Sequence, residues 1–355
     1  MLVGYARCST QEQDPLGQVK ELNENEAPGA KPEERRIAAL IACSAKDALV
    51  RFTSIPGRIR RHVRKFRPDW YFVVRRHWHM HGRFPHLIRP RTFNDKVLHR
   101  ILFDRRAVLT QATDKASVRD YVEARLGRHL LPERYYITID PNTIPFDKLP
   151  DRFVVKPTHG SGMVQIVTDK STLDRAALIE TCRGWLRYSF YEEKREWAYK
   201  NIEPRIIVEQ FIDDGTGKTP DDYKFFAFDG AVEMIQVDTA RFSDHRRRLY
   251  TPTWEKLPVL LDYDDINGEV PRPRHLQQMI AAAEVLGRGL DFIRADFYDT
   301  LDQVYFGELT TTPQGGYHQF RPKEFDHYLG SRWKLPNSIF GWLGFCLYRA
   351  MRRFN

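Results

Sequence analysis

The sequence predicts an α+β fold in which helices come first and a body of mainly antiparallel strands follows. Before residue 132 the apolar residues have helical spacing, whereas short β-rich runs separated by turn residues dominate afterwards. Two of these runs are joined by Asp229-Gly230, a strong signal for a tight hairpin. With 355 residues, 42% of them hydrophobic, the chain is long enough to form two or three lobes.

Two helices are predicted ahead of the strands. Thr92 is typical of an N-cap, and the apolar residues after it have helical spacing to about Phe103. Thr113 or Asp114 should begin the next helix, which Gly127 ends. Later helices are expected at 172–188 and 272–288.

The strands are predicted from β-branched and aromatic runs. A hairpin is expected where 222–230 and 231–238 meet, and two closing strands should contain FIRADFYD and QVYFGEL. The other expected strands contain YYITI, FVVKP, VQIVTD and RIIVEQFI (205–212).

The positive charge is concentrated in one segment. The chain has a net charge of +9, but residues 51–100 alone hold 14 basic and 2 acidic residues, so the rest is slightly acidic. This argues against nucleic acid as a partner, because a nucleic-acid-binding fold would present a basic face built by the whole domain. The four cysteines form no CxxC pair, which argues against a structural zinc site or a disulfide framework. No secretory signal or membrane-spanning run is visible, so a cytoplasmic protein is expected.

Residues 152–168 contain a candidate phosphate-binding loop. Two β-rich runs flank the sequence His159-Gly160-Ser161-Gly162, and the first run ends near Lys156. Glycines let backbone N–H groups approach a polyphosphate, and a lysine on a strand adds a fixed positive charge. The loop is not a Walker A motif, and a plain glycine-containing hairpin is the alternative.

Two carboxylates near the end of the chain form a candidate magnesium site. Asp296 in RADF and Glu308 in GEL lie in neighbouring β-rich runs, so antiparallel pairing would place them on one face. One or two carboxylates together with substrate phosphates suit Mg²⁺. Apolar residues surround both carboxylates, which would be costly to bury without a cation. Solvated strand carboxylates are the alternative.

The strand that contains Glu209 and Gln210 ends in Phe211 and Ile212, which is typical of a hinge segment that could bind an adenine ring. Two further lysines could contribute positive charge to such a site: Lys115 in TDKASVR and Lys224 in DYKFF.

Seven segments in this order resemble the ATP-grasp superfamily, and in particular its TupA-like branch, which is associated with teichuronopeptide and other surface-polysaccharide biosynthesis. The resemblance extends from about residue 66 to 336. The segments are HGRFPHLIRPRTFNDK, TDKASVRDYV, LPDRFVVKPTHGSG, EWAYKNIEPRIIVEQFI, PDDYKFFAFDG, RADFYD and YFGELT…PQGG, followed by FDHYLGSRWKLP.

The resemblance implies two α+β lobes that clamp ATP, with Mg²⁺ as the metal. It implies nucleotide contacts by Lys115, Lys156, the loop from His159 to Gly162, and the hinge Glu209, Gln210, Phe211 and Ile212. It places Lys224 and the phosphoryl-facing Arg294 in catalytic roles, and Asp296, Glu308 and Thr310 as metal ligands. Thr310 departs from the usual asparagine of the superfamily, and Thr158 and Pro313-Gln314-Gly315-Gly316 also differ from the usual pattern.

The implied activity is an ATP-dependent carboxylate–amine ligase that forms an acyl phosphate and then an amide. Its expected substrates are a uronic-acid polysaccharide or precursor and an amino acid. Two alternatives are a glycosyltransferase-type polysaccharide enzyme, although no suitable DxD motif is present, and a non-catalytic ATP- or polysaccharide-binding protein.

Five segments are expected along the chain. The first ten residues, MLVGYARCST, resemble the opening strand of serine recombinases but lack the rest of that catalytic domain, so they are interpreted as a fragment. The apolar and basic C-terminal end could bind an anionic membrane surface, making the protein peripheral, or could pack as a last helix. The segments are 1–55 (an atypical N-terminal segment and linker), 56–112 (a basic helical lead-in), 113–208 (the small lobe with the phosphate loop), 209–336 (the large lobe with the metal site) and 337–355 (the tail).

Overall fold

The computed structural model describes residues 67–215, 219–239 and 245–336. The chain divides into two units, 1–66 and 67–355, and every described residue belongs to the second unit. The segment that resembles a recombinase and the apolar C-terminal tail therefore lie outside the described residues. Within the described ranges, no helix has the length and apolar character that crossing a membrane requires.

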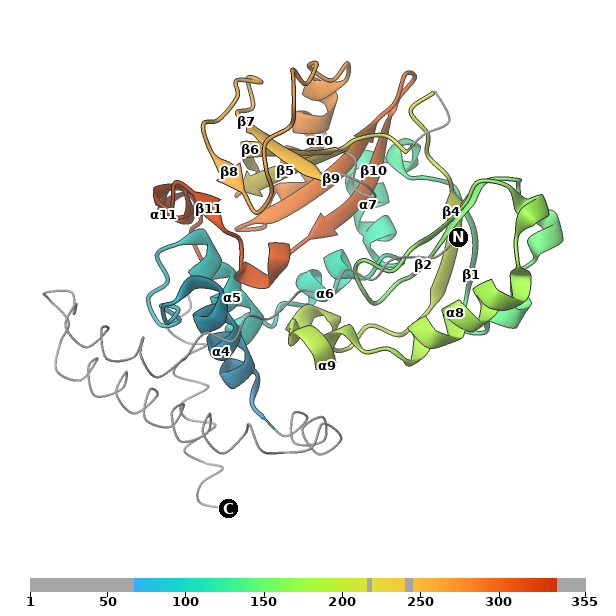
Figure 1. The fold of residues 1–355 in the computed structure, drawn as a ribbon, viewed down its shortest axis with the longest axis horizontal. Helices are drawn as coiled ribbons and strands as arrows, with labels where there is room; N and C mark the ends of the chain where they lie inside the picture. Colours follow the sequence, from blue (N-terminus) through green and yellow to red (C-terminus); the bar gives the residue numbers. More distant parts are fainter. Residues whose placement is uncertain (1–66, 216–218, 240–244, 337–355) are drawn as a thin grey trace, which may run out of the picture. The chain divides into compact units, whose positions relative to one another are not determined.

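A five-stranded antiparallel sheet forms the larger part of the described fold (Figure 1). The predicted hairpin at Asp229-Gly230 is confirmed: both residues have positive φ, 50° and 80°, as a two-residue turn of the primed type requires. The two predicted closing strands also pair with each other. In sheet order the strands are β10 (Val304–Thr310), β9 (Ile293–Asp299), β5 (Asp222–Phe228), β6 (Ala231–Thr239) and β7 (Arg246–Tyr250).

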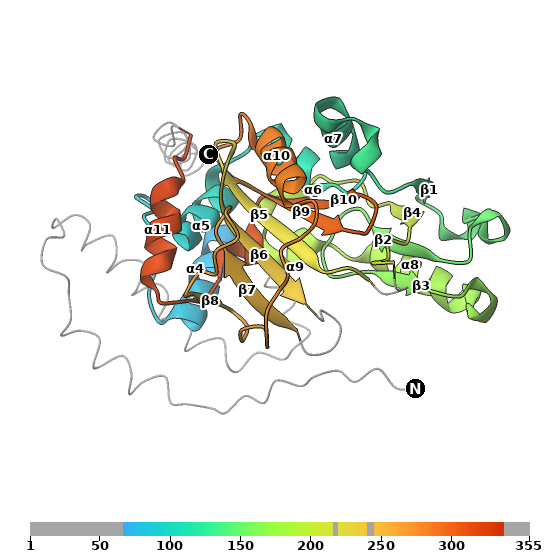
Figure 2. The ribbon, with the colours of Figure 1, turned by 90° about the horizontal axis from the view of Figure 1, so that it is seen from above.

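Helices cover both faces of this sheet. Because side chains alternate along a strand, Phe225 and Phe297 face α10 (Leu276–Gly287) and α7 (Val118–Leu126) in one core. Phe226 on the other face packs in a second core, with Phe93 and Trp333 among its members. The helices of this second core are α4 (Asp69–His81), α5 (Phe93–Phe103) and α11 (Glu324–Arg332), which lie together in Figures 1 and 2.

A smaller four-stranded sheet forms the second lobe. Its order is β1-β4-β2-β3, and all neighbours are antiparallel. Phe153 and Val208 face α8 (Arg175–Arg187) in a third core, so the alternate residues Lys156 and Glu209 lie on the opposite face. The strands are β1 (Arg134–Thr138), β2 (Phe153–Pro157), β3 (Gln165–Val167) and β4 (Ile206–Gln210).

Two helix predictions have different outcomes. The helix predicted after Thr92 is confirmed, and the Thr92 hydroxyl accepts a hydrogen bond from the backbone N–H of Asp95 at 3.1 Å. The helix predicted after Asp114 begins only at Val118. The Asp114 carboxylate accepts from the N–H of Ala116 at 3.0 Å, an arrangement that favours a turn over helix propagation.

The remaining elements connect the lobes or extend the second core. The strand predicted to reach residue 212 ends at Gln210. The short helices are α6 (Ala107–Thr113), α9 (Phe190–Lys194), and the 3₁₀ turns η1 (Arg128–Leu130), η2 (Pro141–Thr143), η3 (Phe146–Lys148), η4 (Lys170–Thr172), η5 (Trp197–Tyr199) and η6 (Pro313–Gly316). β8 (Leu260–Leu261) pairs with β11 (Phe320–Arg321).

Candidate functional site

A cavity of about 400 Å³ is lined by residues of both sheets. That volume is in the range of small-ligand pockets. Eight Lys and Arg residues line it against four Asp and Glu residues, so the cavity favours an anionic ligand. The basic residues are Arg76, Lys115, Arg119, Lys156, Lys194, Lys224, Arg247 and Arg294; the acidic ones are Glu196, Glu209, Asp238 and Glu308.

Strand register places the polar residues of the large sheet on one face. Lys224 of β5 lies opposite both Asp296 of β9 and Gln236 of β6. Phe226 lies two residues after Lys224 on β5, so its side chain is on the same face of the sheet, and it belongs to the apolar second core. One face of the sheet therefore changes from apolar to charged along the strands, and its charged part faces the cavity.

A bulge at Gly307 brings Glu308 onto that face. Phe306 pairs with Phe297, but Glu308 rather than Gly307 pairs with Asp296. Without the extra residue, Glu308 would point to the opposite face, because side chains alternate. The bulge leaves little room: a Cβ on Gly307 would lie 3.1 Å from the backbone oxygen of Asp296.

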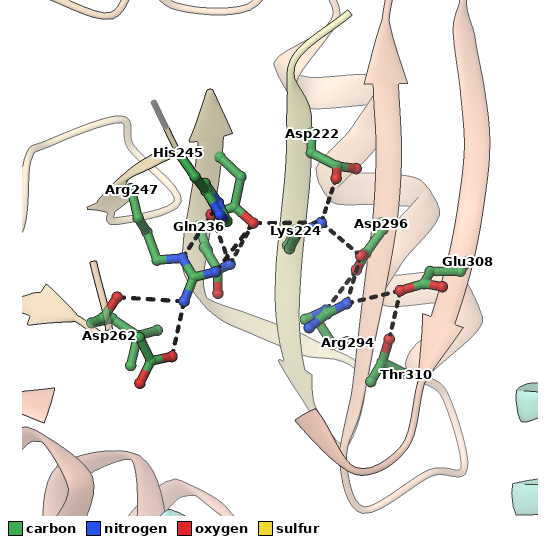
Figure 3. A network of polar contacts seen from close by, with 12 residues as sticks. Asp222, Lys224, Gln236, His245, Arg247, Asp262, Arg294, Asp296, Glu308 and Thr310 are labelled. Carbon is green, nitrogen blue, oxygen red and sulfur yellow. Dashed lines mark hydrogen bonds and ion pairs between the residues drawn. The ribbon is translucent and has the colours of Figure 1, made fainter. Parts of the chain in front are cut away.

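Arg294 joins the two carboxylates predicted to bind metal (Figure 3). Its Nη2 donates to Asp296 Oδ2 at 2.7 Å and to Glu308 Oε1 at 3.0 Å. Thr310 Oγ1 also donates to Glu308 Oε1, at 3.3 Å. The Arg294 guanidinium is thus shared by the carboxylates of Asp296 and Glu308. Two carboxylates close enough to share one cationic group could also share a divalent cation.

The donor set fits Mg²⁺ only in company with phosphate. Within the described ranges, no three or more His, Cys, Asp or Glu side chains gather as a metal site. Mg²⁺ is commonly held by one or two carboxylates, waters and substrate phosphates, so Asp296 and Glu308 would be enough in number as protein ligands. Of the two, Glu308 lines the cavity, whereas both oxygens of Asp296 accept hydrogen bonds from Arg294 or Lys224 in this structure. Thr310 would add a neutral hydroxyl oxygen.

Lys224 is buried among three carboxylates, of which Figure 3 labels Asp222 and Asp296. Its Nζ lies 2.8 Å from Asp222 Oδ2, 3.0 Å from Asp296 Oδ2 and 3.8 Å from Asp238 Oδ2. Burial acts to lower the pKa of Lys224, but Asp222 and Asp296 outweigh burial and the pKa is raised. Lys224 is therefore a permanent positive charge beside the candidate metal ligands.

The charged network continues into β7, which sequence reasoning did not identify. Arg247 Nε donates to Asp238 Oδ1 at 2.6 Å, and its Nη1 donates to Asp262 Oδ2 at 3.0 Å. Asp238 and Arg247 share the polar face because they are register partners. The period-two pattern of Gln236 and Asp238 after the hairpin was the available signal.

The small sheet contributes a second set of charges. Lys156 forms an ion pair with Glu209, and Arg119 Nη1 lies 3.7 Å from the other carboxylate oxygen of Glu209. Sequence reasoning missed Arg119, although its i, i+4 spacing from Lys115 was a signal. Burial lowers the pKa of Lys115, whose ammonium donates to the carbonyl of Gly160 in the predicted phosphate loop.

The cavity contains only part of the predicted nucleotide set. Ser161 and Gly162 of the loop line it. The backbone of Gly162 has φ = 76°, a value that residues other than glycine rarely adopt. His159 points elsewhere: it is 4% exposed, and its Nε2 lies 3.0 Å from the carbonyl of Trp185 on α8. The cavity lining includes Lys115, Lys156, Ser161, Gly162, Glu209, Lys224, Arg294, Glu308 and Thr310, whereas His159, Gly160, Gln210, Phe211, Ile212 and Asp296 lie outside it.

Of the four predicted hinge residues, Glu209 lines the cavity, whereas Gln210, Phe211 and Ile212 do not. Gln210 Nε2 donates to the Tyr305 hydroxyl at 3.3 Å, and the Arg152 guanidinium stacks 4.2 Å from the centre of the Phe211 ring. The apolar residues of the cavity lining, which sequence reasoning also missed, include Val118, Pro132, Phe306 and Leu309.

Two antiparallel sheets that each present a charged face to one cavity, with cations in excess, agree with the ATP-grasp fold that the sequence predicts. A family model described as TupA-like ATPgrasp matches residues 95–334, so the chain belongs to the TupA-like ATP-grasp family. The predicted family and the predicted α+β ATP-grasp fold are confirmed.

Solved structures of ATP-grasp ligases resemble the fold. The D-alanine–D-alanine ligase from Bacillus anthracis complexed with ATP is 20% identical, with 57% of each chain covered and a TM-score of 0.34. The L-amino acid ligase from Bacillus licheniformis is 17% identical over 58% of this chain and 44% of that chain, with a TM-score of 0.37. The ATP-grasp ligase PsnB, complexed with a minimal precursor, Mg and ADP, is 16% identical over 62% and 55%, with a TM-score of 0.32.

The chain spans less than two thirds of the length of each of these enzymes. No curated protein matches the chain. ATP-grasp ligases use ATP together with Mg²⁺.

Proposed function

We propose that the protein is an ATP-dependent carboxylate–amine ligase that joins an amino acid to a uronic-acid polysaccharide or its precursor. The observation that carries this proposal is the convergence of Lys115, Lys156, Lys224 and Arg294 with Glu308 around one cavity. Phosphoryl transfer depends on positioning and on neutralising charge, so such a cationic cavity needs no protein nucleophile.

The nucleotide is proposed to lie with its adenine near the small sheet. Under this proposal the ring would contact apolar residues of the cavity lining, Val118, Pro132, Phe306 and Leu309, and would lie beside the charged trio of Glu209, Lys156 and Arg119. Lys156 and Lys115, together with the backbone N–H groups of Ser161 and Gly162, would contact the phosphates; the support is that all four residues line the cavity. Lys115 already contacts the loop through Gly160, so it can couple loop position to phosphate binding.

The γ-phosphoryl group is proposed to lie against the large sheet. Asp296 and Glu308, with Thr310, would hold Mg²⁺, whose chemistry is to neutralise charge on the phosphate oxygens. Arg294 would then exchange its contact with Glu308 for the transferring phosphoryl group, while its two hydrogen bonds to Asp296 keep the guanidinium in place. Lys224 holds Asp296 from the other side.

The reaction has two steps under this proposal. The substrate carboxylate attacks the γ-phosphorus, ADP leaves, and an acyl phosphate forms. An amine then attacks the acyl carbon, an amide bond forms, and phosphate leaves. Support for a polysaccharide substrate comes from membership of the TupA-like family, a branch that is associated with teichuronopeptide biosynthesis.

The proposal is tested by measuring ADP release from the full chain with Mg²⁺-ATP, across uronic acids and amino acids. We expect release that requires both a carboxylate and an amine, and Lys156→Ala should abolish it. Lys148→Ala is the matched control, because Lys148 is an exposed lysine of the same lobe outside the cavity. Carboxylate-independent ADP release, or full activity of Lys156→Ala, would overturn the proposal.

A peripheral membrane location is proposed for the same enzyme, because its substrate would be assembled on a lipid carrier. The support is charge: Arg75 on α4 and Arg89 and Arg91 in the segment between α4 and α5 are exposed. Flotation with vesicles of anionic lipid tests this, and no binding to anionic vesicles at low salt would overturn it.

A further inference from the structure

The cavity contains a carboxylate that the nucleotide site does not use. Glu196 lines the cavity, is 9% exposed, and lies just before η5 in the segment EWAYKN. Its Oε2 accepts a hydrogen bond from Thr312 Oγ1 at 2.5 Å. Among the residues that the structure describes, no cation forms an ion pair with Glu196.

An unpaired carboxylate in such a position is costly in the absence of a ligand, because burial disfavours its charge. Burial accordingly raises the pKa of Glu196 to about 7, although Thr312, Arg76 and Lys194 act in the opposite direction. Two tyrosines, Tyr199 and Tyr317, also lie within electrostatic range of Glu196. A bound cation would remove the cost of the buried charge.

Glu196 is close to the reaction centre. Its partner Thr312 is two residues from Thr310, and two residues of chain span at most about 7 Å. Tyr199 links the two regions electrostatically, since Glu196 and Glu308 both act on its pKa. A group held by Glu196 would therefore lie on the same side of the cavity as Thr310 and Glu308.

Arg76 supplies the opposite charge at the same end of the cavity. Its guanidinium stacks 4.4 Å from the centre of the Tyr317 ring, so its position is defined. No salt bridge joins it to Glu196 or to any other carboxylate in the described part of the chain. A buried anion and a positioned cation that face one cavity without contacting each other match the two charges of a free α-amino acid.

From this arrangement we infer that Glu196 and Arg76 form the amino-acid subsite, in which Glu196 binds the ammonium group and accepts its proton, and Arg76 binds the α-carboxylate. The inference rests on the proposed ligase function. The ammonium proton passes to the Glu196 carboxylate, and the neutral nitrogen forms a bond to the acyl carbon. The carbon–oxygen bond to phosphate breaks, and the second nitrogen proton leaves with the phosphate.

Hydroxylamine separates this role from the earlier steps. It is unprotonated at neutral pH and traps acyl phosphates as hydroxamates, so it needs no proton acceptor. The full chain is given Mg²⁺-ATP and glucuronate or galacturonate, with either hydroxylamine or each common amino acid. In Glu196→Gln, we expect kcat/KM for the amino acid to fall by about 100-fold, while hydroxamate formation equals that of the wild type. Glu192→Gln, an exposed carboxylate on α9, should match the wild type in both reactions.

Arg76 has its own readout. In Arg76→Gln, KM for the amino acid should rise by about tenfold with kcat retained, because a charge-assisted contact is lost. The preference of the wild type for alanine over alaninamide should also disappear.

Each result decides between the two claims. Loss of hydroxamate formation in Glu196→Gln, or retained amino-acid ligation, would overturn the inference and leave the ligase function standing. If the wild type makes no hydroxamate from either uronic acid, the proposed function falls and the inference falls with it.

Discussion

Glu308→Gln should abolish activity without unfolding the protein. The Glu308 side chain is 39% exposed, and its contacts with Arg294 and Thr310 are 3.0 and 3.3 Å long. An ion pair that is exposed to this degree contributes at most about 1 kcal/mol, so the free energy of unfolding should change by that amount or less. Because the variant loses a charged magnesium ligand, kcat for ADP formation should fall by about 100-fold or more.

Asp296→Asn provides the contrast. Asp296 is 1% exposed and accepts two hydrogen bonds from Arg294, both at 2.7 Å, and one from Lys224 at 3.0 Å. Loss of this buried charge weakens the pairing of two buried cations, which should lower the free energy of unfolding by about 3 kcal/mol. Activity should be lost as in Glu308→Gln, but together with stability.

The measurements are urea unfolding followed by tryptophan fluorescence, and ADP release at saturating Mg²⁺-ATP. Glu255→Gln, an exposed carboxylate outside the cavity, is the control and should leave both values unchanged. The reasoning is refuted if Glu308→Gln keeps wild-type activity, or if it destabilises the protein as much as Asp296→Asn does.

Three further predictions concern the loop, the charged network and the second core. Gly162→Ala should weaken ATP binding by about tenfold, since φ is 76° there and alanine strains the loop; calorimetric titration with ATP measures this, and unchanged affinity would refute it. Burial acts to raise the pKa of Asp238, but Arg247 and Lys224 outweigh burial and the pKa falls well below its usual 3.8. The folded state therefore holds this carboxylate ionised, so its contribution to stability is present above pH 3.8 and is lost as the pH falls further. In urea titrations, the difference in free energy of unfolding between wild type and Asp238→Asn should become smaller below pH 3.8. A difference that stays constant with pH would count against the network. Phe93→Ala should cost about 3–5 kcal/mol in urea unfolding, because Phe93 is fully buried among aromatic rings, and a loss below 1 kcal/mol would contradict this packing.

Local signals were sufficient for most of the fold. The hairpin at Asp229-Gly230 and the helix after Thr92 depend on one or two residues whose conformational preferences are strong, and both are confirmed. The predicted start of the helix after Asp114 was wrong, because the Asp114 carboxylate can cap a turn as readily as a helix. The same ambiguity limits any prediction of boundaries from a single sequence.

The site was predictable only where chemistry and motif coincide. Asp296 and Glu308 were expected to share a face, and they do, but the bulge at Gly307 that makes this possible depends on register. Arg247 and Glu196 were missed because their roles arise from contacts between segments distant in sequence. Side-chain direction has the same limitation: His159 sits in a matching motif, yet it packs against α8.

The central claim is that the two sheets bind one Mg²⁺-ATP between them, and a crystal structure with Mg²⁺ and a non-hydrolysable ATP analogue tests it most directly. We expect the phosphates to lie within hydrogen-bond distance of Lys115 and Lys156, with the metal on Asp296 and Glu308. A nucleotide bound outside this cavity, or a metal that touches neither carboxylate, would contradict the claim.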